Sequence, residues 1–315
     1  MSSTNVVDFS VRQNKTIERL IVFDNLQNLI EGLDLTKLVY VGFGSVWFTD
    51  FHLAHRQLGI TTMRSIEMDP IVYRRANFNK PYRTLKVIEG NSTVAIPSLI
   101  ANRLLRTKPW IVWLDYDKCI DEARTSEISY LIRYLPPDST LLITCSARLD
   151  RYGELEDRLE RLEELFGDSV PSGLSNESIR DNQGFMNVLR KCLENYMISS
   201  AIRISRTGGF VPAFSIAYRD TTPMVTVGGF LPSARLESAA RTLIAAPDWS
   251  GRVEDPIITP PLTPREVSTL QAQLPRDSEL SRSRLRQLGF DLEDSQLKAY
   301  VDHYLKYPTF AQVAL

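Results

Sequence analysis

The feature that most constrains the fold is a turn with two closely spaced glycines between an apolar run and an aromatic-rich segment. The apolar run 38–41 leads into Gly42, Gly44 and Ser45, and the segment 46–58 follows. The run is typical of a strand buried in a parallel sheet, and the following segment has the spacing of a helix. Glycine lets a flat ligand approach the backbone, and the N–H groups that start a helix can bind an anion. The sequence therefore predicts a strand, a glycine turn and a helix, with either a ligand site or an ordinary tight turn at their junction.

The bulk composition is typical of a soluble globular protein. Of the 315 residues, 43% are hydrophobic and 24% charged, and the net charge is -1. This balance does not indicate nucleic acid as a partner. The sequence contains neither a signal-peptide pattern nor a stretch of about 20 apolar residues, so we expect a cytoplasmic protein without a membrane anchor. The three cysteines are far apart and form no Cys-x-x-Cys motif, which indicates reduced thiols and no zinc site.

Residues 1–36 are predicted to form a polar tail and an amphipathic helix. The helical pattern starts at Arg12. Lys15, Glu18 and Arg19 interrupt its apolar residues, and two interpretations remain open. These side chains form either a solvated face of the helix or part of a functional site.

Residues 37–232 have the alternating pattern of an α/β domain. Four further apolar runs are predicted as strands, over residues 62–67, 84–88, 110–114 and 139–144. Ligands of open α/β sheets bind outside the carboxyl ends of the strands, so the polar residues at these ends form a candidate site. They are Glu67, Asn91, Ser92, Asp115, Tyr116 and Asp117.

The acid at the end of the second predicted strand, Glu67, has a specific interpretation. In a doubly wound sheet it lies beside the first glycine turn, where it can accept hydrogen bonds from both hydroxyls of a ribose. About 23 positions separate it from Gly44, which suits this function. Together with the other strand ends, Glu67 predicts a nucleotide-like ligand.

Two later apolar runs predict how the sheet ends. Residues 210–218 and 223–231 flank a four-residue turn, which is the pattern of an antiparallel hairpin. Five parallel strands closed by a hairpin resemble the sheet of class I methyltransferases, whereas a dinucleotide-binding domain continues with parallel strands. The predicted fold is thus a Rossmann-like α/β sheet with an N-terminal helix and a C-terminal helical region.

Two further regions are candidates for contacts with other proteins. Residues 149–166 have a leucine stripe and charged pairs, and are predicted to form one charged helix that is an insertion or a partner surface. Residues 233–315 are predicted to form a linker and a helical region, which is a substrate cap, an oligomerisation module or a docking site. We expect a protein partner or a homo-oligomer to use these two regions.

Several segments resemble a bacterial group of O-methyltransferases without an established substrate. They cover residues 12–19, 42–51, 65–67, 78–82 and 113–117. The resemblance implies an S-adenosylmethionine site. In it, Gly42, Gly44 and Ser45 lie under the methionine and sugar, Glu67 holds the ribose, Asn91 with Ser92 contacts the adenine, and Asp115 stands near the methyl donor.

The sequence departs from this resemblance at some positions. Tyr40 stands where class I methyltransferases usually carry an acid two residues before the first glycine. Thr144-Cys145 replaces the Asp-Asn pair that catechol-type O-methyltransferases use to bind a metal, so we expect no metal-dependent catechol mechanism. His52 and His55 lack a third ligand nearby and are interpreted as packed or surface residues rather than as a metal site.

Two functions follow from these observations. The leading one is a transferase that moves a methyl group from S-adenosylmethionine to an oxygen or nitrogen acceptor of unknown identity. Asp115, Tyr116 and Asp117 are the candidates for removing the acceptor's proton, without a further assignment among them. The alternative is a catalytically degenerate cofactor-binding or scaffold subunit of a larger bacterial complex, such as an antiviral defence system. A nicotinamide-dependent oxidoreductase is disfavoured, because Trp47 occupies the place of the last glycine of its motif.

Overall fold

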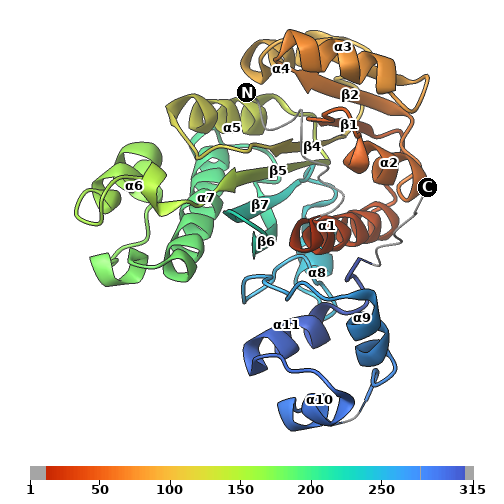
Figure 1. Cartoon of the computed structure of the whole chain (residues 1–315). Coiled ribbons are helices and arrows are strands. Elements are labelled where there is room, and N and C mark those ends of the chain that lie inside the picture. The colour runs from red at the N-terminus through yellow and green to blue at the C-terminus, as the bar shows by residue number, and fades with distance from the viewer. Residues whose placement is uncertain (1–11, 277, 309–315) are drawn as a thin grey trace.

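The central sheet has the predicted parallel order and closing hairpin. The computed structural model describes residues 12–276 and 278–308, and in these residues seven strands form a sheet of order β3-β2-β1-β4-β5-β7-β6 (Figure 1). The strands are β1 (Val39–Gly42), β2 (Thr62–Glu67), β3 (Leu85–Glu89), β4 (Trp110–Asp115), β5 (Ser139–Ser146), β6 (Val211–Arg219) and β7 (Pro223–Leu231). Neighbouring strands are parallel, except that β7 is antiparallel to both β5 and β6. The predicted fold class is confirmed.

Side chains of the central strands alternate between two hydrophobic cores on opposite faces of the sheet. In β4, Trp110, Val112 and Leu114 belong to one core, and Ile111 and Trp113 to the other. A strand buried on both faces needs apolar residues at every position, which explains the continuous apolar runs in the sequence.

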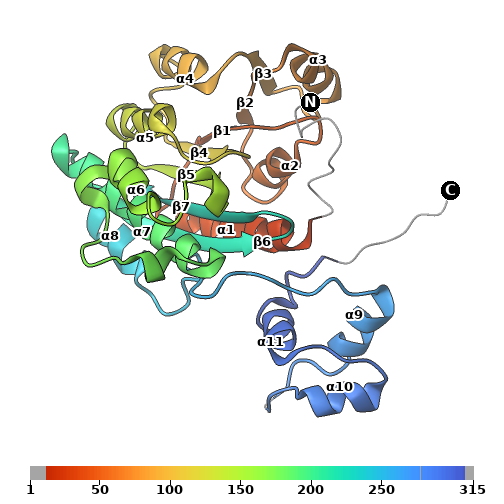
Figure 2. The ribbon, with the colours of Figure 1, turned by 60° about the vertical axis from the view of Figure 1, so that its left-hand side comes forward.

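Helices cover both faces, as Figures 1 and 2 show. The core that contains Val112 also contains residues of α4 (Ser92–Ala101), α5 (Glu122–Tyr134), α6 (Arg158–Phe166) and α7 (Asn182–Arg203). The opposite core contains residues of α1 (Gln13–Gly32), α2 (Thr49–Arg56), α3 (Pro70–Asn79) and α8 (Glu237–Ile244). None of the described helices is long and apolar enough to cross a membrane.

The N-terminal helix α1 is attached at its first turn to the turn between β6 and β7. The backbone N–H groups of Asn14 and Lys15 donate to the two carboxylate oxygens of Asp220 at 2.9 and 3.1 Å. The Asn14 amide also donates to the Arg219 carbonyl at 2.8 Å. Asp220 thus serves as a distant cap for N–H groups that have no partner within the helix. This attachment holds the start of α1 beside the sheet.

The chain after β7 covers the sheet edge that β6 would otherwise expose. The Ser215 N–H donates to the Gly251 carbonyl at 3.0 Å, and the Ile257 N–H donates to the Ala217 carbonyl at 2.8 Å. Covering an edge strand in this way hides its unpaired backbone groups. The C-terminal helices follow as α9 (Pro264–Gln271), α10 (Arg282–Leu288) and α11 (Asp294–His303). The division of the chain into regions 1–36, 37–232 and 233–315 stays a prediction.

The predicted single helix over residues 149–166 is wrong. The structure has a short 3-10 turn, η3 (Leu149–Arg151), and then α6 from residue 158. Gly153 lies between them with φ +90°, a left-handed conformation that a right-handed helix cannot contain. Two more 3-10 turns, η4 (Gly167–Ser169) and η5 (Asn176–Ile179), lead to α7.

Candidate functional site

A cavity of about 1040 Å³ lies where the first four strands end. The structure brings eight of the predicted site residues to its wall: Gly44, Ser45, Glu67, Asn91, Ser92, Asp115, Tyr116 and Asp117. Gly42 does not belong to the wall. A Cβ at Gly42 would lie 2.8 Å from the Trp113 carbonyl oxygen, so this glycine allows β1 and β4 to approach each other. The wall also includes three basic residues of the N-terminal segment, Arg12, Lys15 and Arg19.

The turn after β1 is held in a conformation that most residues avoid. The Gly44 N–H donates to Ser65 Oγ at 3.0 Å. Ser45 and Phe48 have φ values of 50° and 51°, in the left-handed region. A Cβ at Gly44 would lie 2.5 Å from the Phe48 ring and 2.7 Å from Ser65 Oγ. Gly44 is therefore required for the shape of the turn that forms this part of the cavity wall.

The substitution Gly44→Ala is expected to destabilise the protein by about 1–3 kcal/mol, because the methyl group must displace Phe48 or Ser65. Urea unfolding of the two proteins measures this difference. Gly32→Ala is the matched control, since its Cβ meets only the end of the flexible Leu243 side chain. Equal stability of Gly44→Ala and Gly32→Ala would contradict this account of the turn.

Glu67 presents a buried carboxyl group to the cavity from the end of β2. Its side chain is 7% exposed. Burial raises the pKa of Glu67 to about 7, although hydrogen bonds from the backbone of Ser45, the hydroxyl of Ser65 and the backbone of Gly44 act in the opposite direction. Such a carboxyl group can change its protonation state near neutral pH, and in its ionised form it can accept hydrogen bonds from two neighbouring hydroxyls.

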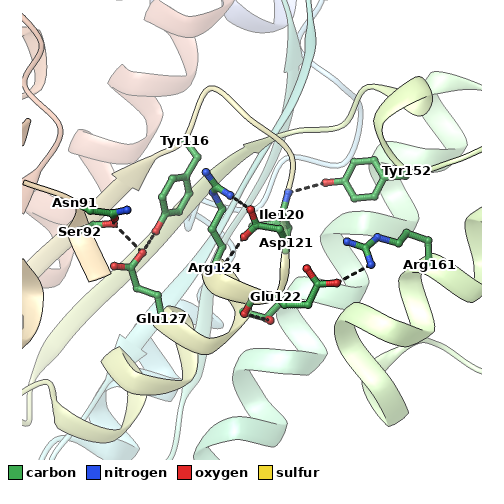
Figure 3. Close-up of polar contacts among 11 residues, drawn as sticks. Asn91, Ser92, Tyr116, Ile120, Asp121, Glu122, Arg124, Glu127, Tyr152 and Arg161 are labelled. Carbon is green, nitrogen blue, oxygen red and sulfur yellow. Dashed lines mark hydrogen bonds and ion pairs between the residues drawn. The ribbon is translucent and has the colours of Figure 1, made fainter. Parts of the chain in front are cut away.

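A polar cluster lies at the start of α4 and beside α5 (Figure 3). Ser92 Oγ donates to Glu127 Oε2 at 3.0 Å, and the Tyr116 hydroxyl donates to the same oxygen. Burial is the main cause that raises the pKa of Glu127 and the pKa of Tyr116. Among the described residues, Glu127 Oε1 has no hydrogen-bond partner. The cavity wall therefore contains a buried oxygen that can accept a ligand's N–H or O–H group.

The start of α1 carries a buried group of charges, of which Lys15 and Arg19 line the cavity. Lys15 Nζ lies 2.7 Å from Asp115 Oδ2 and 3.2 Å from Glu18 Oε2. Arg19 Nε donates to Asp50 Oδ1. Lys15 and Arg19 are 3% and 4% exposed, and Glu18 is fully buried. Burial contradicts the interpretation of these side chains as a solvated face, and Lys15 and Arg19 line the cavity.

The buried charges are linked to the sheet through hydroxyl groups. Thr226 Oγ1 donates to Glu18 Oε1 at 2.6 Å, and lies 2.7 Å from Thr144 Oγ1. Trp113 Nε1 donates to Thr144 Oγ1 at 2.9 Å. Thr144 occupies the position of the metal-binding Asp of catechol-type O-methyltransferases. In this structure it is part of a polar network that reaches Glu18 of α1.

The comparison with protein families identifies the chain's relatives. Residues 7–315 match a family model described as "Putative O-methyltransferase". The chain belongs to this family. No curated protein matches the chain. The sheet, parallel over five strands and closed by an antiparallel hairpin, agrees with the fold that the resemblance implied.

Solved structures with similar folds include several methyltransferases. The cofactor-bound protein Rv0187 from MTB is 12% identical, with 73% of this chain and 85% of that chain covered and a TM-score of 0.38. An arsenic(III) S-adenosylmethionine methyltransferase from Chlamydomonas reinhardtii is 11% identical, with 65% and 64% covered and a TM-score of 0.37. The S-adenosylmethionine-dependent methyltransferase SibL is 12% identical, with 68% and 57% covered and a TM-score of 0.34. The chain thus spans less than two thirds of the length of the last two proteins. Sequence identities and TM-scores this low carry no argument about activity.

In this member of the O-methyltransferase family, Tyr40 is a core residue. It is 1% exposed and packs edge-on against Phe51, with ring centroids 5.0 Å apart. Burial is the main cause that raises the pKa of Tyr40 well above its usual value, so the hydroxyl stays neutral. The acid expected at this position is replaced by a neutral aromatic side chain that stabilises the packing of α2 on β1.

The two histidines of α2 contact Tyr82. His52 Nδ1 lies 3.0 Å from the Tyr82 hydroxyl, and the His55 ring centroid lies 4.2 Å from that of Tyr82. The described residues contain no group of three or more His, Cys, Asp or Glu side chains that could hold a metal ion.

Sequence reasoning missed four acids of the cavity wall, Asp50, Asp69, Asp121 and Glu127. Asp50 stands in an otherwise aromatic segment, and this isolated charge was a usable signal. Glu127 lies within a helix of mixed polarity, where the sequence offers no comparable signal. Its proximity to Tyr116 and Ser92 depends on how α5 packs beside β4.

Proposed function

We propose that the cavity binds S-adenosylmethionine and that the protein transfers its methyl group to a hydroxyl or amine acceptor. The observation that carries this proposal is the placement of Gly44, Glu67, Asn91 and Asp115 on one wall at the ends of four adjacent strands. Membership of the O-methyltransferase family supports the same reaction class.

The chemistry of the cavity wall fits this cofactor. Glu67 can accept hydrogen bonds from the ribose hydroxyls, and Asn91 with Ser92 and Glu127 supplies polar atoms for the adenine. The buried oxygen Glu127 Oε1 and the buried nitrogen Arg19 Nη1 have no partner among the described residues, as expected for groups that a polar ligand completes.

The chain's own task is to place and deprotonate the acceptor. When bound, S-adenosylmethionine supplies an electrophilic methyl group on a sulfonium. Asp115 lies at the end of β4 with its carboxylate held by Lys15, and Asp117 lies two residues further along the same wall. Either carboxylate can take up an acceptor's proton, whereas the Tyr116 hydroxyl is engaged as a donor to Glu127. We therefore assign the proton-accepting role to the aspartate pair.

Transfer of a labelled methyl group from S-adenosylmethionine into a cell extract tests the proposal. The wild-type protein should label one fraction, and Asp115→Asn should lower the rate by at least about 100-fold if that carboxylate is the base. Asp117→Asn is the matched variant that separates the two aspartates. Cofactor binding without transfer into any extract would support the alternative, a cofactor-binding or scaffold subunit of a larger complex.

The charged segment 149–166 and the region 233–315 are our proposal for contacts with a protein partner or a second copy of the chain. Size-exclusion chromatography with light scattering measures the oligomeric state directly.

A further inference from the structure

Arg19 is a buried cation with an unused hydrogen-bonding nitrogen in the cavity wall. The side chain is 4% exposed and belongs to α1. Its Nε donates to Asp50, while Nη1 is buried and, in the part of the chain that the structure describes, donates to no acceptor. A buried guanidinium N–H without an acceptor costs free energy, so a ligand that accepts from it gains affinity.

The charges around Arg19 indicate which ligand group fits. Burial alone lowers the pKa of Arg19, but attraction to Asp50 and Glu18 outweighs this and raises the pKa above its usual value. The guanidinium is therefore charged, and its free nitrogen favours an anionic acceptor. Asp50 lies on the same wall, and its carboxylate can also accept from a cationic group. A cation with a free N–H beside a carboxylate is complementary to a zwitterion, such as the end of an α-amino acid.

We propose that Arg19, oriented by Asp50, binds the α-carboxylate of the amino-acid arm of the cofactor. This inference rests on the proposed function and adds a residue of the N-terminal helix to the cofactor site. It also gives the Asp50 contact a role, because the hydrogen bond at Nε holds the planar guanidinium in place and leaves Nη1 for the ligand.

Calorimetric titration with two ligands tests the assignment. S-adenosylhomocysteine carries the amino-acid arm, and 5′-methylthioadenosine keeps the nucleoside and sulfur but lacks the carboxylate. In Arg19→Met we expect affinity for S-adenosylhomocysteine to fall by about 10- to 100-fold, as for loss of a charge-assisted hydrogen bond. Affinity for 5′-methylthioadenosine should stay within about twofold of wild type by the same reasoning.

Two further variants make the test specific. Lys118→Met removes an exposed cation of the same wall and should leave the ratio of the two affinities unchanged. Arg19→Gln keeps a donor for Asp50 and guards against misfolding of Arg19→Met, and it should show the same selective loss. Thermal melting of the free variants confirms that each is folded.

The outcomes separate this inference from the proposed function. Equal loss of both ligands, or loss of neither, in folded Arg19 variants would overturn the role of Arg19 while leaving the cofactor site intact. Failure of the wild-type protein to bind either ligand would overturn the proposed function, and the role of Arg19 with it.

Discussion

Glu67→Ala is expected to weaken binding of S-adenosylhomocysteine by at least about 100-fold at a pH of about 8. The carboxylate of Glu67 can form two hydrogen bonds with the ribose hydroxyls. Each charge-assisted hydrogen bond contributes about 1.5–3 kcal/mol, and about 1.4 kcal/mol corresponds to tenfold in affinity. Isothermal titration calorimetry measures the loss. An affinity within about threefold of wild type would show that Glu67 does not contact the ligand.

The pH dependence of wild-type binding provides an independent check on Glu67. Burial raises its pKa to about 7, so the carboxyl group is protonated in a growing fraction of molecules as the pH falls below that value. A protonated carboxyl group cannot accept from both hydroxyls, so we expect affinity to fall below a pH of about 7, by up to tenfold per unit. Glu67→Gln should bind weakly at every pH and remove this dependence.

The stability of the free protein should depend on pH in the opposite way to the affinity, because it should decrease as the pH rises. A carboxyl group whose pKa is higher in the folded than in the unfolded protein contributes stability below its unfolded pKa, and this contribution is lost as the pH rises through the folded value. Glu67→Gln is therefore expected to stabilise the free protein at a pH of about 8, by on the order of 2 kcal/mol, as urea unfolding would measure.

Lys15→Met is expected to destabilise the protein by about 3–5 kcal/mol, the largest stability effect in this account. Lys15 is 3% exposed and its ammonium lies between the carboxylates of Glu18 and Asp115. Methionine fills a similar volume but leaves the fully buried Glu18 without its cation. Urea unfolding at a pH of about 7 measures the loss, which converts to free energy through the denaturant slope.

A double variant provides the control for this ion pair. Lys15→Met combined with Glu18→Gln removes both charges but keeps an acceptor for Thr226, so it should recover at least half of the lost stability. Burial raises the pKa of Glu18, so the single variant should also lose less stability as the pH is lowered and Glu18 becomes protonated. A double variant no more stable than the single one would argue against a buried-charge origin.

Much of the sheet could be predicted because its signals are local. Glycines, strand-terminal acids and the four-residue turn act over a few residues, and residues 110–114 of β4 are all apolar because this strand is buried on both faces. The same signals predicted eight residues of the cavity wall. The break at Gly153 was missed because a leucine stripe starts two residues after it, at Leu155, and glycine is compatible with both outcomes.

The role of the N-terminal helix could not be predicted, because its partners are distant in sequence. Whether Lys15 and Arg19 face solvent or a site depends on where α1 lies. That position is set by Asp220, about 200 residues later, and by the acids Asp50 and Asp115. Nothing in the local pattern of α1 distinguishes a solvated charged face from a buried one.

The measurement that tests the central claim most directly is calorimetric titration of the wild-type protein with S-adenosylhomocysteine and, separately, with NAD. Both ligands carry an adenosine, but only the first has the amino-acid arm that the charges near α1 fit. We predict one site with micromolar affinity for S-adenosylhomocysteine and much weaker binding of NAD. No heat from S-adenosylhomocysteine, in a sample that melts cooperatively, would contradict the cofactor site on which this account rests.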